Sequence, residues 1–269
     1  MAGWTAASAS PLRPCFVNAL SGYDTLDLEQ TAEFNRVNFP QVAGRLFPKR
    51  RNPSPPIHQE QNMRRPGSVR GLEVLGRVRL SASFFMRDFL HSEIADFHGI
   101  PNLPDHPDLA IAAGRKLCDE LLEPLQATFG RLAIRSAYRA PAVNAFGNEH
   151  GLNCASNERN RGRHIWDQRD RDGNMGAMAT VVLPWFADWS AEGGDWRAMA
   201  WWIHDQLPYS QLQFFPRLGA FNIGWRENPV RRIDSFVAPR GCLTRAGLPN
   251  WTGDHALEYA ALLVRRDRR

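Results

Sequence analysis

The chain has 269 residues, of which 43% are hydrophobic, and nine of them are tryptophans. This composition excludes a globally disordered chain and suffices for one buried core with extensions. The formal net charge of +5 arises within residues 1–79, which contain eleven basic and six acidic residues, so the rest of the chain is neutral.

The N-terminal extension is the basic part of the chain. Residues 40–70 are rich in Pro, Arg, Gln and Asn, a composition typical of a linker or a draped arm. No aromatic side chains alternate with its charges, so nucleic acid is expected as a partner only through this basic arm. We expect a cytoplasmic protein without a membrane span, because neither a secretory leader nor an apolar run of roughly 20 residues is present.

Helices are predicted to begin the folded part. A short helix is expected over residues 84–97, with three phenylalanines sharing one face: Phe85, Phe89 and Phe97. A second helix should begin at Asp108 and end at Gly130, because leucines recur at four-residue spacing: Leu117, Leu121 and Leu125. Pro141 suits the first turn of a further helix.

Strands dominate the second half of the sequence. Strands are predicted over residues 131–139, 176–184, 210–216, 220–225 and 231–237. In the fourth of these, alternation places Phe221, Ile223 and Trp225 on one face and Asn222 on the other. Residues 195–207 should form a helix with one buried face: Trp196, Met199, Ile203 and Leu207. Together with a closing helix over 253–266, this order indicates an α+β fold with a small antiparallel sheet packed against helices.

Four segments resemble the D-Ala-D-Ala carboxypeptidase family, whose fold is shared with the hedgehog signalling domain. FFMRDFLHSEIADFHGIPNLPD is similar to its N-terminal helix and turn, and IRSAYRAPAVN is similar to its strand and turn "SgYRsp-vN". GAMATVVLP is similar to the end of the metal motif, and LPYSQLQFFPRLGAFNIGW to the C-terminal hairpin. The resemblance implies a core over 80–237, with residues 1–79 and 238–269 as extensions.

The family holds a metal with His, Asp and His, and a neighbouring carboxylate serves as general base. The resemblance implies that Arg139, with Ser136 and Tyr138, contacts the substrate. It also implies that Thr180 stands at the aspartate position and Asn222 at the second histidine position. The position of the general base falls on Phe215 or Gly219, and neither is acidic. Most of the metal and catalytic residues are therefore lost.

Residues 148–175 are polar and longer than most loops, which is typical of a functional segment. His164 is the nearest candidate for the first histidine, and with Asp167 it could hold zinc or iron in a relocated site, helped by His150 or Glu149. The alternative is that His164 hydrogen-bonds inside a packed loop while the aspartates pair with arginines. His204 is expected to be exposed, and His255 to be structural.

Three functions are compatible with these residues. The first is a pseudoenzyme of bacterial or phage type, which binds a small anionic or peptide ligand or performs altered chemistry in the same cleft. Here Arg139 would recognise a carboxylate, or it could anchor its turn through backbone carbonyls. The second is an active metal-dependent hydrolase of peptide or peptidoglycan with rearranged ligands. The third is an interaction or assembly protein that acts through its basic arm.

Overall fold

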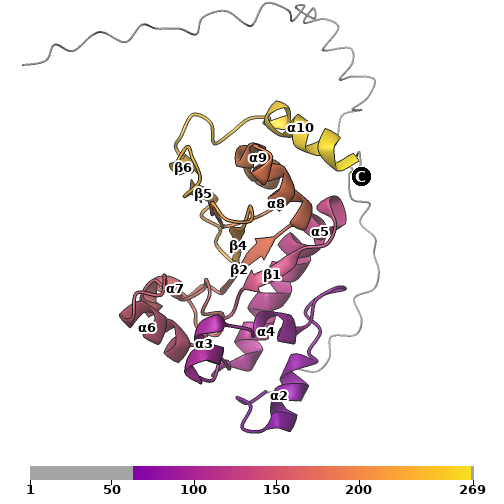
Figure 1. Cartoon of the computed structure of the whole chain (residues 1–269). Helices are drawn as coiled ribbons and strands as arrows, with labels where there is room; N and C mark the ends of the chain where they lie inside the picture. The colour runs from indigo at the N-terminus through magenta and orange to yellow at the C-terminus, as the bar shows by residue number, and fades with distance from the viewer. Residues whose placement is uncertain (1–62, 268–269) are drawn as a thin grey trace, which may run out of the picture. The chain divides into compact units, whose positions relative to one another are not determined.

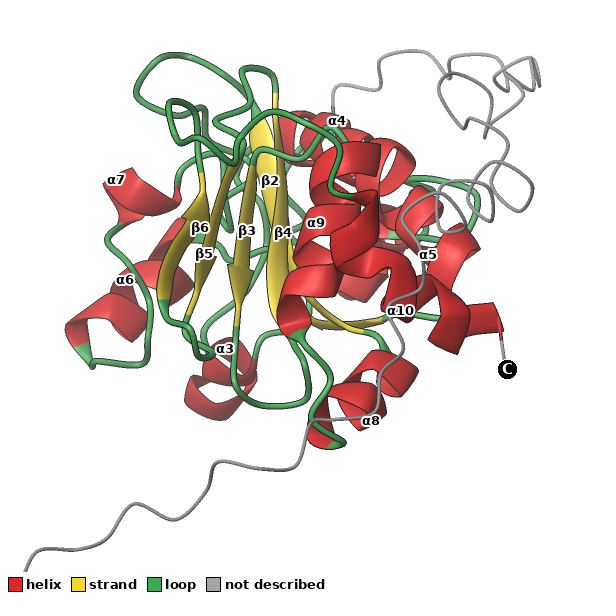
Figure 2. Ribbon diagram, turned by 90° about the horizontal axis from the view of Figure 1, so that it is seen from above, coloured by secondary structure: helices red, strands yellow, loops and turns green. Residues whose placement is uncertain are grey.

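Six strands form one mixed sheet (Figure 1, Figure 2). The computed structural model describes residues 63–267. Its strands are β1 (Ala133–Ser136), β2 (Gly176–Val182), β3 (Gln211–Phe214), β4 (Phe221–Arg226), β5 (Arg232–Ser235) and β6 (Gly241–Thr244). Their order across the sheet is β1-β2-β4-β3-β5-β6, and all neighbours are antiparallel except β3 and β5. The expected α+β class is confirmed.

Helices precede, connect and follow the strands. They are α2 (Val69–Gly76), η1 (Met86–Phe89), α3 (Glu93–His98), α4 (Pro107–Leu117), η2 (Cys118–Leu122), α5 (Glu123–Phe129), α6 (Pro141–Glu149), α7 (Asn157–Asn160), α8 (Pro184–Ala191), α9 (Trp196–Gln206) and α10 (Ala256–Asp267). Figure 2 shows α4, α5, α9 and α10 on one side of the sheet. Within the described residues, no helix is long and apolar enough to cross a membrane.

The two faces of the sheet differ in chemistry. On β4, Phe221, Ile223 and Trp225 join the apolar core, and Asn222 alternates with them as the sequence predicts. The core-facing side of β2 packs against α4, whose apolar side chains belong to the same cluster. The opposite face of the sheet is therefore the one available for a polar site.

The long helical segment before β1 follows the predicted leucine spacing. Leu117, Leu121 and Leu125 are all fully buried, and the helix ends at Gly130, whose φ is +82°. A side chain is strained at a positive φ, so glycine suits this position. The π-helical turn η2 between α4 and α5 was not expected from the sequence. It changes the pitch without removing the leucines from the core.

The single helix predicted over residues 84–97 is wrong. The segment forms two separate short helices, η1 and α3. Of the three phenylalanines expected to share a face, only Phe89 is buried, whereas Phe85 and Phe97 are exposed. Each helix has its own start: the Asp88 carboxylate accepts from the Phe85 N–H, and the Ser92 hydroxyl accepts from the Ala95 N–H. These two local caps interrupt the periodic pattern.

The predicted extensions contribute to the same compact unit as the core. Leu75 of α2 is fully buried, although the sequence places it in the N-terminal extension. At the other end, β6 pairs with β5, and α10 packs along α9. The boundaries expected at 79/80 and 237/238 therefore fall inside one folded unit. Most of the basic arm, including all of residues 40–62, lies outside the described residues.

Candidate ligand-binding site

The face of the sheet opposite α4 carries a line of polar side chains, which we call the polar row. It takes one residue from each of five neighbouring strands: Ser136, Thr180, Asn222, Gln213 and Asp234. Each residue is paired directly with the next, so their side chains emerge on the same face of the sheet. Thr180 and Asn222, which the sequence resemblance would align with two metal ligands, are thus direct neighbours on β2 and β4.

Hydrogen bonds connect the centre of the polar row. The Thr180 hydroxyl donates to the Asn222 Oδ1 at 2.6 Å, and the Asn222 amide donates to the Gln213 Oε1 at 3.3 Å. Asp234 is the only acid of the row, and it forms two hydrogen bonds of 2.7 Å with Arg232. Neutral hydroxyl and amide oxygens are weak ligands for zinc. The row can therefore donate and accept hydrogen bonds, but it offers no free base.

Arg139 lies at the β1 end of the polar row. Its backbone N–H donates to the carbonyl of His164 at 2.8 Å, which fixes the turn. The guanidinium contacts neutral groups: Nη1 is 3.1 Å from the Cys154 Sγ, and Nη2 is 3.5 Å from the Ser136 Oγ. No carboxylate among the described residues pairs with it, and it bonds none of their carbonyls. The half-buried charge is thus available to an anion and does not anchor the turn.

His164 is buried next to this turn in a neutral form. Its Nδ1 donates to the carbonyl of Ala137 at 2.7 Å, so Nε2 carries the lone pair. Burial, followed by the charge of Arg139, lowers the pKa of His164 to about 3. The positive charge near the row at neutral pH therefore belongs to arginines and not to the imidazole.

Tyr138 and Asp167 lie in the interior, away from the polar row. The Tyr138 ring packs edge-on against Trp166, and both Tyr138 and Asp167 are fully buried. Asp167 accepts a hydrogen bond from the backbone N–H of Asp105 at 2.7 Å. Burial, followed by the charge of Asp167, raises the pKa of Tyr138. Contrary to expectation, Tyr138 is not placed to contact a ligand, because its side chain is fully buried and packs against Trp166.

The relocated metal site expected around His164 and Asp167 is not assembled. The two side chains turn to different partners, Ala137 and Asp105, so they do not share an open position. His150 stacks on Phe146 and does not join them. The alternative of a packed loop fits better, because His164 is hydrogen-bonded and buried. Among the described residues, the one group of three metal-type side chains lies elsewhere, at His204, Asp205 and His255.

That second group stabilises the C-terminal segment. The His204 Nε2 donates to the carbonyl of Trp251, and its Nδ1 accepts from the Tyr209 hydroxyl. The prediction that His204 is exposed is wrong, because α9 is covered by the chain that leads to α10. His255 contacts Asp205 through Nδ1 at 2.7 Å and the Asn250 carbonyl through Nε2 at 3.1 Å. A metal would have to displace these partners.

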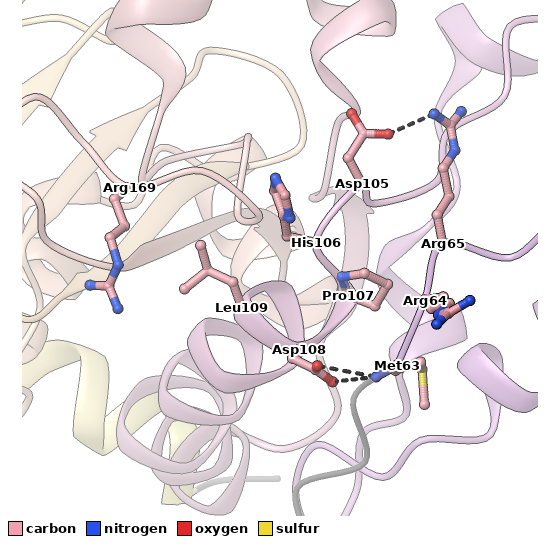
Figure 3. A pocket seen from close by; sticks show the side chains of 9 residues that line it. All are labelled: Met63, Arg64, Arg65, Asp105, His106, Pro107, Asp108, Leu109 and Arg169. Carbon is pink, nitrogen blue, oxygen red and sulfur yellow. Dashed lines mark hydrogen bonds and ion pairs between the residues drawn. The ribbon is translucent and has the colours of Figure 1, made fainter.

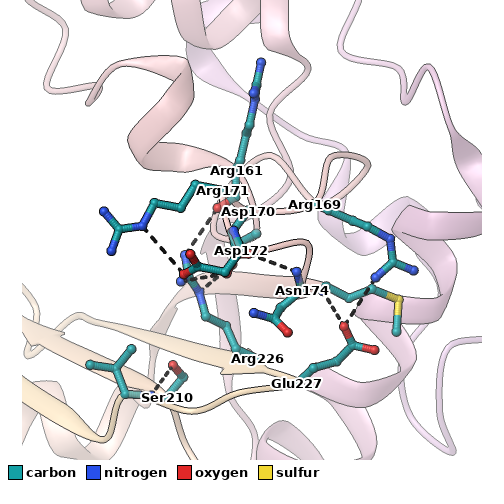
Figure 4. Close-up of polar contacts among 12 residues, drawn as sticks. Arg161, Arg169, Asp170, Arg171, Asp172, Asn174, Ser210, Arg226 and Glu227 are labelled. Atoms are coloured by element: carbon teal, nitrogen blue, oxygen red, sulfur yellow. Dashed lines mark hydrogen bonds and ion pairs between the residues drawn. The ribbon is translucent and has the colours of Figure 1, made fainter.

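Residues 148–175 are held by polar contacts to helix α6 and to strand β4. The Asn144 amide donates to Ala155 and Asn157, and its oxygen accepts from Asn160. Further along, Arg226 pairs with Asp170 at 3.2 Å and donates to the carbonyls of Arg161 and Gly162 (Figure 4). Arg226 emerges on the same face of β4 as Asn222, so the loop lies beside the polar row.

Sequence reasoning missed several parts of this face. Gln213 and Asp234 extend the row, Cys154 contacts Arg139, and Arg226 holds the loop. The alternation of residues 211–214 was a usable signal for Gln213, because Leu212 and Phe214 are buried. The place of Asp234 depends on the parallel pairing of β3 with β5, which no local pattern indicates.

A separate hollow of about 550 Å³ lies at the start of α4 (Figure 3). Its lining includes Arg65, which pairs with Asp105 at 2.6 Å, and Arg169. Asp108 accepts from the backbone N–H of Met63, so the chain before α2 is fastened to α4. No residue of the polar row lines this hollow. Two of its charged lining residues, Arg65 and Asp105, already pair with each other, and Arg169 pairs with Glu227.

The polar row, with the unpaired Arg139 at one end, is the arrangement that best fits a binding site. It lies on the sheet face opposite α4, and the loop beside it is held in place by Arg226. The chain matches no protein-family model, no curated protein and no solved structure.

Proposed function

We propose that this protein is a binding protein on a scaffold like that of the D-Ala-D-Ala carboxypeptidases, with the ancestral metal site lost. Its ligand is a small anion or peptide whose carboxylate is held by Arg139 beside the polar row. The observation that carries the proposal is the half-buried Arg139 guanidinium, which contacts neutral groups and has no acidic partner among the described residues.

The register of the sheet supports the scaffold part of the proposal. A metal needs ligands that converge on one point, and Thr180 and Asn222 face each other on adjacent strands. Aspartate and histidine at these two positions would stand side by side. The residues present instead hydrogen-bond to each other, which satisfies the polar groups that a metal would otherwise bind.

The chemistry of arginine supports the choice of ligand. Its planar guanidinium matches a carboxylate with two parallel hydrogen bonds, and such charge-assisted bonds contribute roughly 1.5–3 kcal/mol. The Ser136 hydroxyl lies close enough to add a further donor. With the one carboxylate of the row, Asp234, paired with Arg232, and no assembled metal ligands beside the row, the arrangement favours recognition over hydrolysis.

The proposal can be tested with a peptide that differs only at its C-terminus. Acetyl-D-alanyl-D-alanine with a free carboxylate should bind the purified protein in a calorimetric titration, and the corresponding amide should not. Arg139→Gln should abolish this difference. Arg135→Gln is the matched control, because Arg135 is exposed on β1, four residues before Arg139, and is already paired with Glu93. Equal binding of acid and amide would contradict the proposal.

Metal content and hydrolysis provide the second test. Elemental analysis of the purified protein should find no stoichiometric zinc or iron, and the same peptide should remain uncleaved. One equivalent of zinc together with release of D-alanine would establish the alternative, an active metallopeptidase with rearranged ligands.

A further inference from the structure

A second guanidinium on the row-bearing face, that of Arg163, has no hydrogen-bonded or ion-paired partner among the described residues. Its Nε is buried and makes no hydrogen bond, and no described carboxylate forms an ion pair with the side chain. Such a charge is costly to bury unless it is paired. Burial, followed by repulsion from Arg226, lowers the pKa of Arg163, and the charge of Asp234 opposes this shift only in part.

The acids close to Arg163 are already engaged by other arginines. Asp170 pairs with Arg226 at 3.2 Å, and both side chains are largely shielded from solvent. Asp234 pairs with Arg232 through two hydrogen bonds of 2.7 Å. Asp234 acts on Arg163 only through its charge, because its oxygens are bonded to Arg232. Arg163 is therefore left without a directly bonded acid among the described residues, and an outside anion would supply one.

The backbone around Arg163 is held firmly. Its carbonyl accepts from the Met178 N–H of β2 at 3.0 Å, and its own N–H donates to the Asn160 carbonyl at 3.0 Å. Arg226 donates to the carbonyls of the two preceding residues. A guanidinium on so fixed a backbone loses little freedom when it binds a ligand.

We propose that Arg163 forms a second anion-binding subsite, so that the ligand carries two acidic groups, one held by Arg139 and one by Arg163. This inference rests on the proposed function, because it extends the same site along the polar row. The ligand class is an elongated dicarboxylate, such as a short acidic peptide with a free C-terminus.

The placement of the two arginines sets the length of the ligand. Arg139 contacts Ser136 on β1, whereas Arg163 lies near Arg226 on β4. These strands are two positions apart, roughly 10 Å across the sheet, and Arg226 lies four residues beyond Asn222, roughly 13 Å further along the strand. A single small anion is too short to contact both guanidinium groups. Three extended residues span about 10 Å, and the long side chains of the arginines and of an acidic first residue cover part of the remaining distance, so a tripeptide is the shortest ligand expected to contact both subsites.

Two tripeptides isolate the second acidic group. Acetyl-Asp-Ala-Ala carries two carboxylates, and acetyl-Asn-Ala-Ala has the same shape with one. The full-length protein should bind the first about tenfold more tightly in calorimetric titrations, because the second contact is a charge-assisted pair. Arg163→Gln should weaken binding of the dicarboxylate to the level of the monocarboxylate and leave the monocarboxylate unchanged. Arg163→Lys, which keeps the charge, should retain part of the preference and serves as a check on folding.

Controls separate this inference from the proposed function. Arg161→Gln removes an exposed neighbour that contacts Gln168 and should leave both affinities unchanged. Equal binding of the two peptides by the wild type, or an equal loss for both in Arg163→Gln, would overturn the second subsite while leaving the Arg139 site intact. If neither peptide nor acetyl-D-alanyl-D-alanine bound, the proposed function and this inference would both fail.

Discussion

At the polar row, the arginines carry the positive charge, whereas His164 is neutral and hydrogen-bonds to the backbone. The imidazole is neutral because burial and Arg139 disfavour its protonated form, and its Nδ1–H is used by Ala137. Arginine keeps its charge at any physiological pH. A ligand at the row therefore meets a fixed positive charge and neutral donors, and its binding should change little between pH 6 and 8.

The burial of His164 predicts a specific loss of stability in acid. An unfolded histidine has a pKa of about 6.5, above the folded value of about 3, so the unfolded state binds the proton more tightly. The contribution of His164 to the free energy of unfolding is therefore full above pH 6.5 and decreases as the pH drops toward 3. At pH 5 the wild type should have lost about 2 kcal/mol more than His164→Asn, which keeps a donor for Ala137. Urea unfolding at pH 7 and pH 5 measures the difference, and equal losses would contradict it.

The facing pair Thr180 and Asn222 predicts that a metal site can be restored. The double variant Thr180→Asp, Asn222→His should acquire up to one equivalent of zinc, because the new aspartate and histidine would face each other on adjacent strands. Elemental analysis after dialysis measures the metal. In the control, Thr180→Asp is combined with Gln211→His. Gln211 lies on β3, two pairs away from the Gln213–Asn222 pair, so this variant should bind no zinc. A folded double variant without zinc would contradict the carboxypeptidase-like register.

At the scale of elements, a shielded polar contact just before α10 joins the chain to α9, beside the buried apolar residues Tyr259 and Leu262 of α10. The Asp205 carboxylate accepts from the backbone N–H of His255 and contacts its ring at 2.7 Å. The His255 ring also stacks on Trp201, with 4.1 Å between ring centroids. By contrast, Arg265 pairs with Glu192 at 2.9 Å in an exposed position. The two contacts tie the same helix to the body of the protein in different environments.

These environments predict different energies. Asp205→Ala should lower the free energy of unfolding by about 1–3 kcal/mol, because it leaves His255 with unsatisfied donors in a shielded site. Glu192→Ala should cost less than about 1 kcal/mol, because exposed ion pairs contribute little. Chemical denaturation of the two variants measures both values. Equal effects would mean that α10 is not held by the Asp205 contact.

Elements with a strong local period could be predicted from the sequence, and those defined by distant partners could not. The leucines of α4 to α5 and the apolar face of α9 recur at helical spacing and are buried as expected. The strand β6 has two exposed residues and a short length, so only its pairing with β5 reveals it. Likewise, Thr180 and Asn222 were indicated by a resemblance, whereas Gln213, Asp234 and Arg163 join the site through strand order and loop packing.

At the scale of the whole molecule, helix α2 belongs to the folded unit, although the sequence analysis placed it in the N-terminal extension. Leu75 is fully buried and α2 packs against η1, so the unit begins before residue 69. Removal of residues 1–79 would therefore take away part of the core. Loss of a core leucine alone costs roughly 2–5 kcal/mol. A loss of binding after deletion of residues 1–79 could therefore result from lower stability.

A shorter deletion distinguishes the binding site from the arm. A protein lacking residues 1–62 keeps every described residue of the polar row, together with Arg139 and Arg163, and should bind acetyl-Asp-Ala-Ala with unchanged affinity in calorimetric titrations. A protein lacking residues 1–79 should unfold at a lower temperature, because Leu75 no longer fills the core. If the shorter deletion abolished peptide binding while its circular dichroism and melting temperature stayed unchanged, the basic arm would be the binding element. The site on the sheet would then be excluded as the source of affinity.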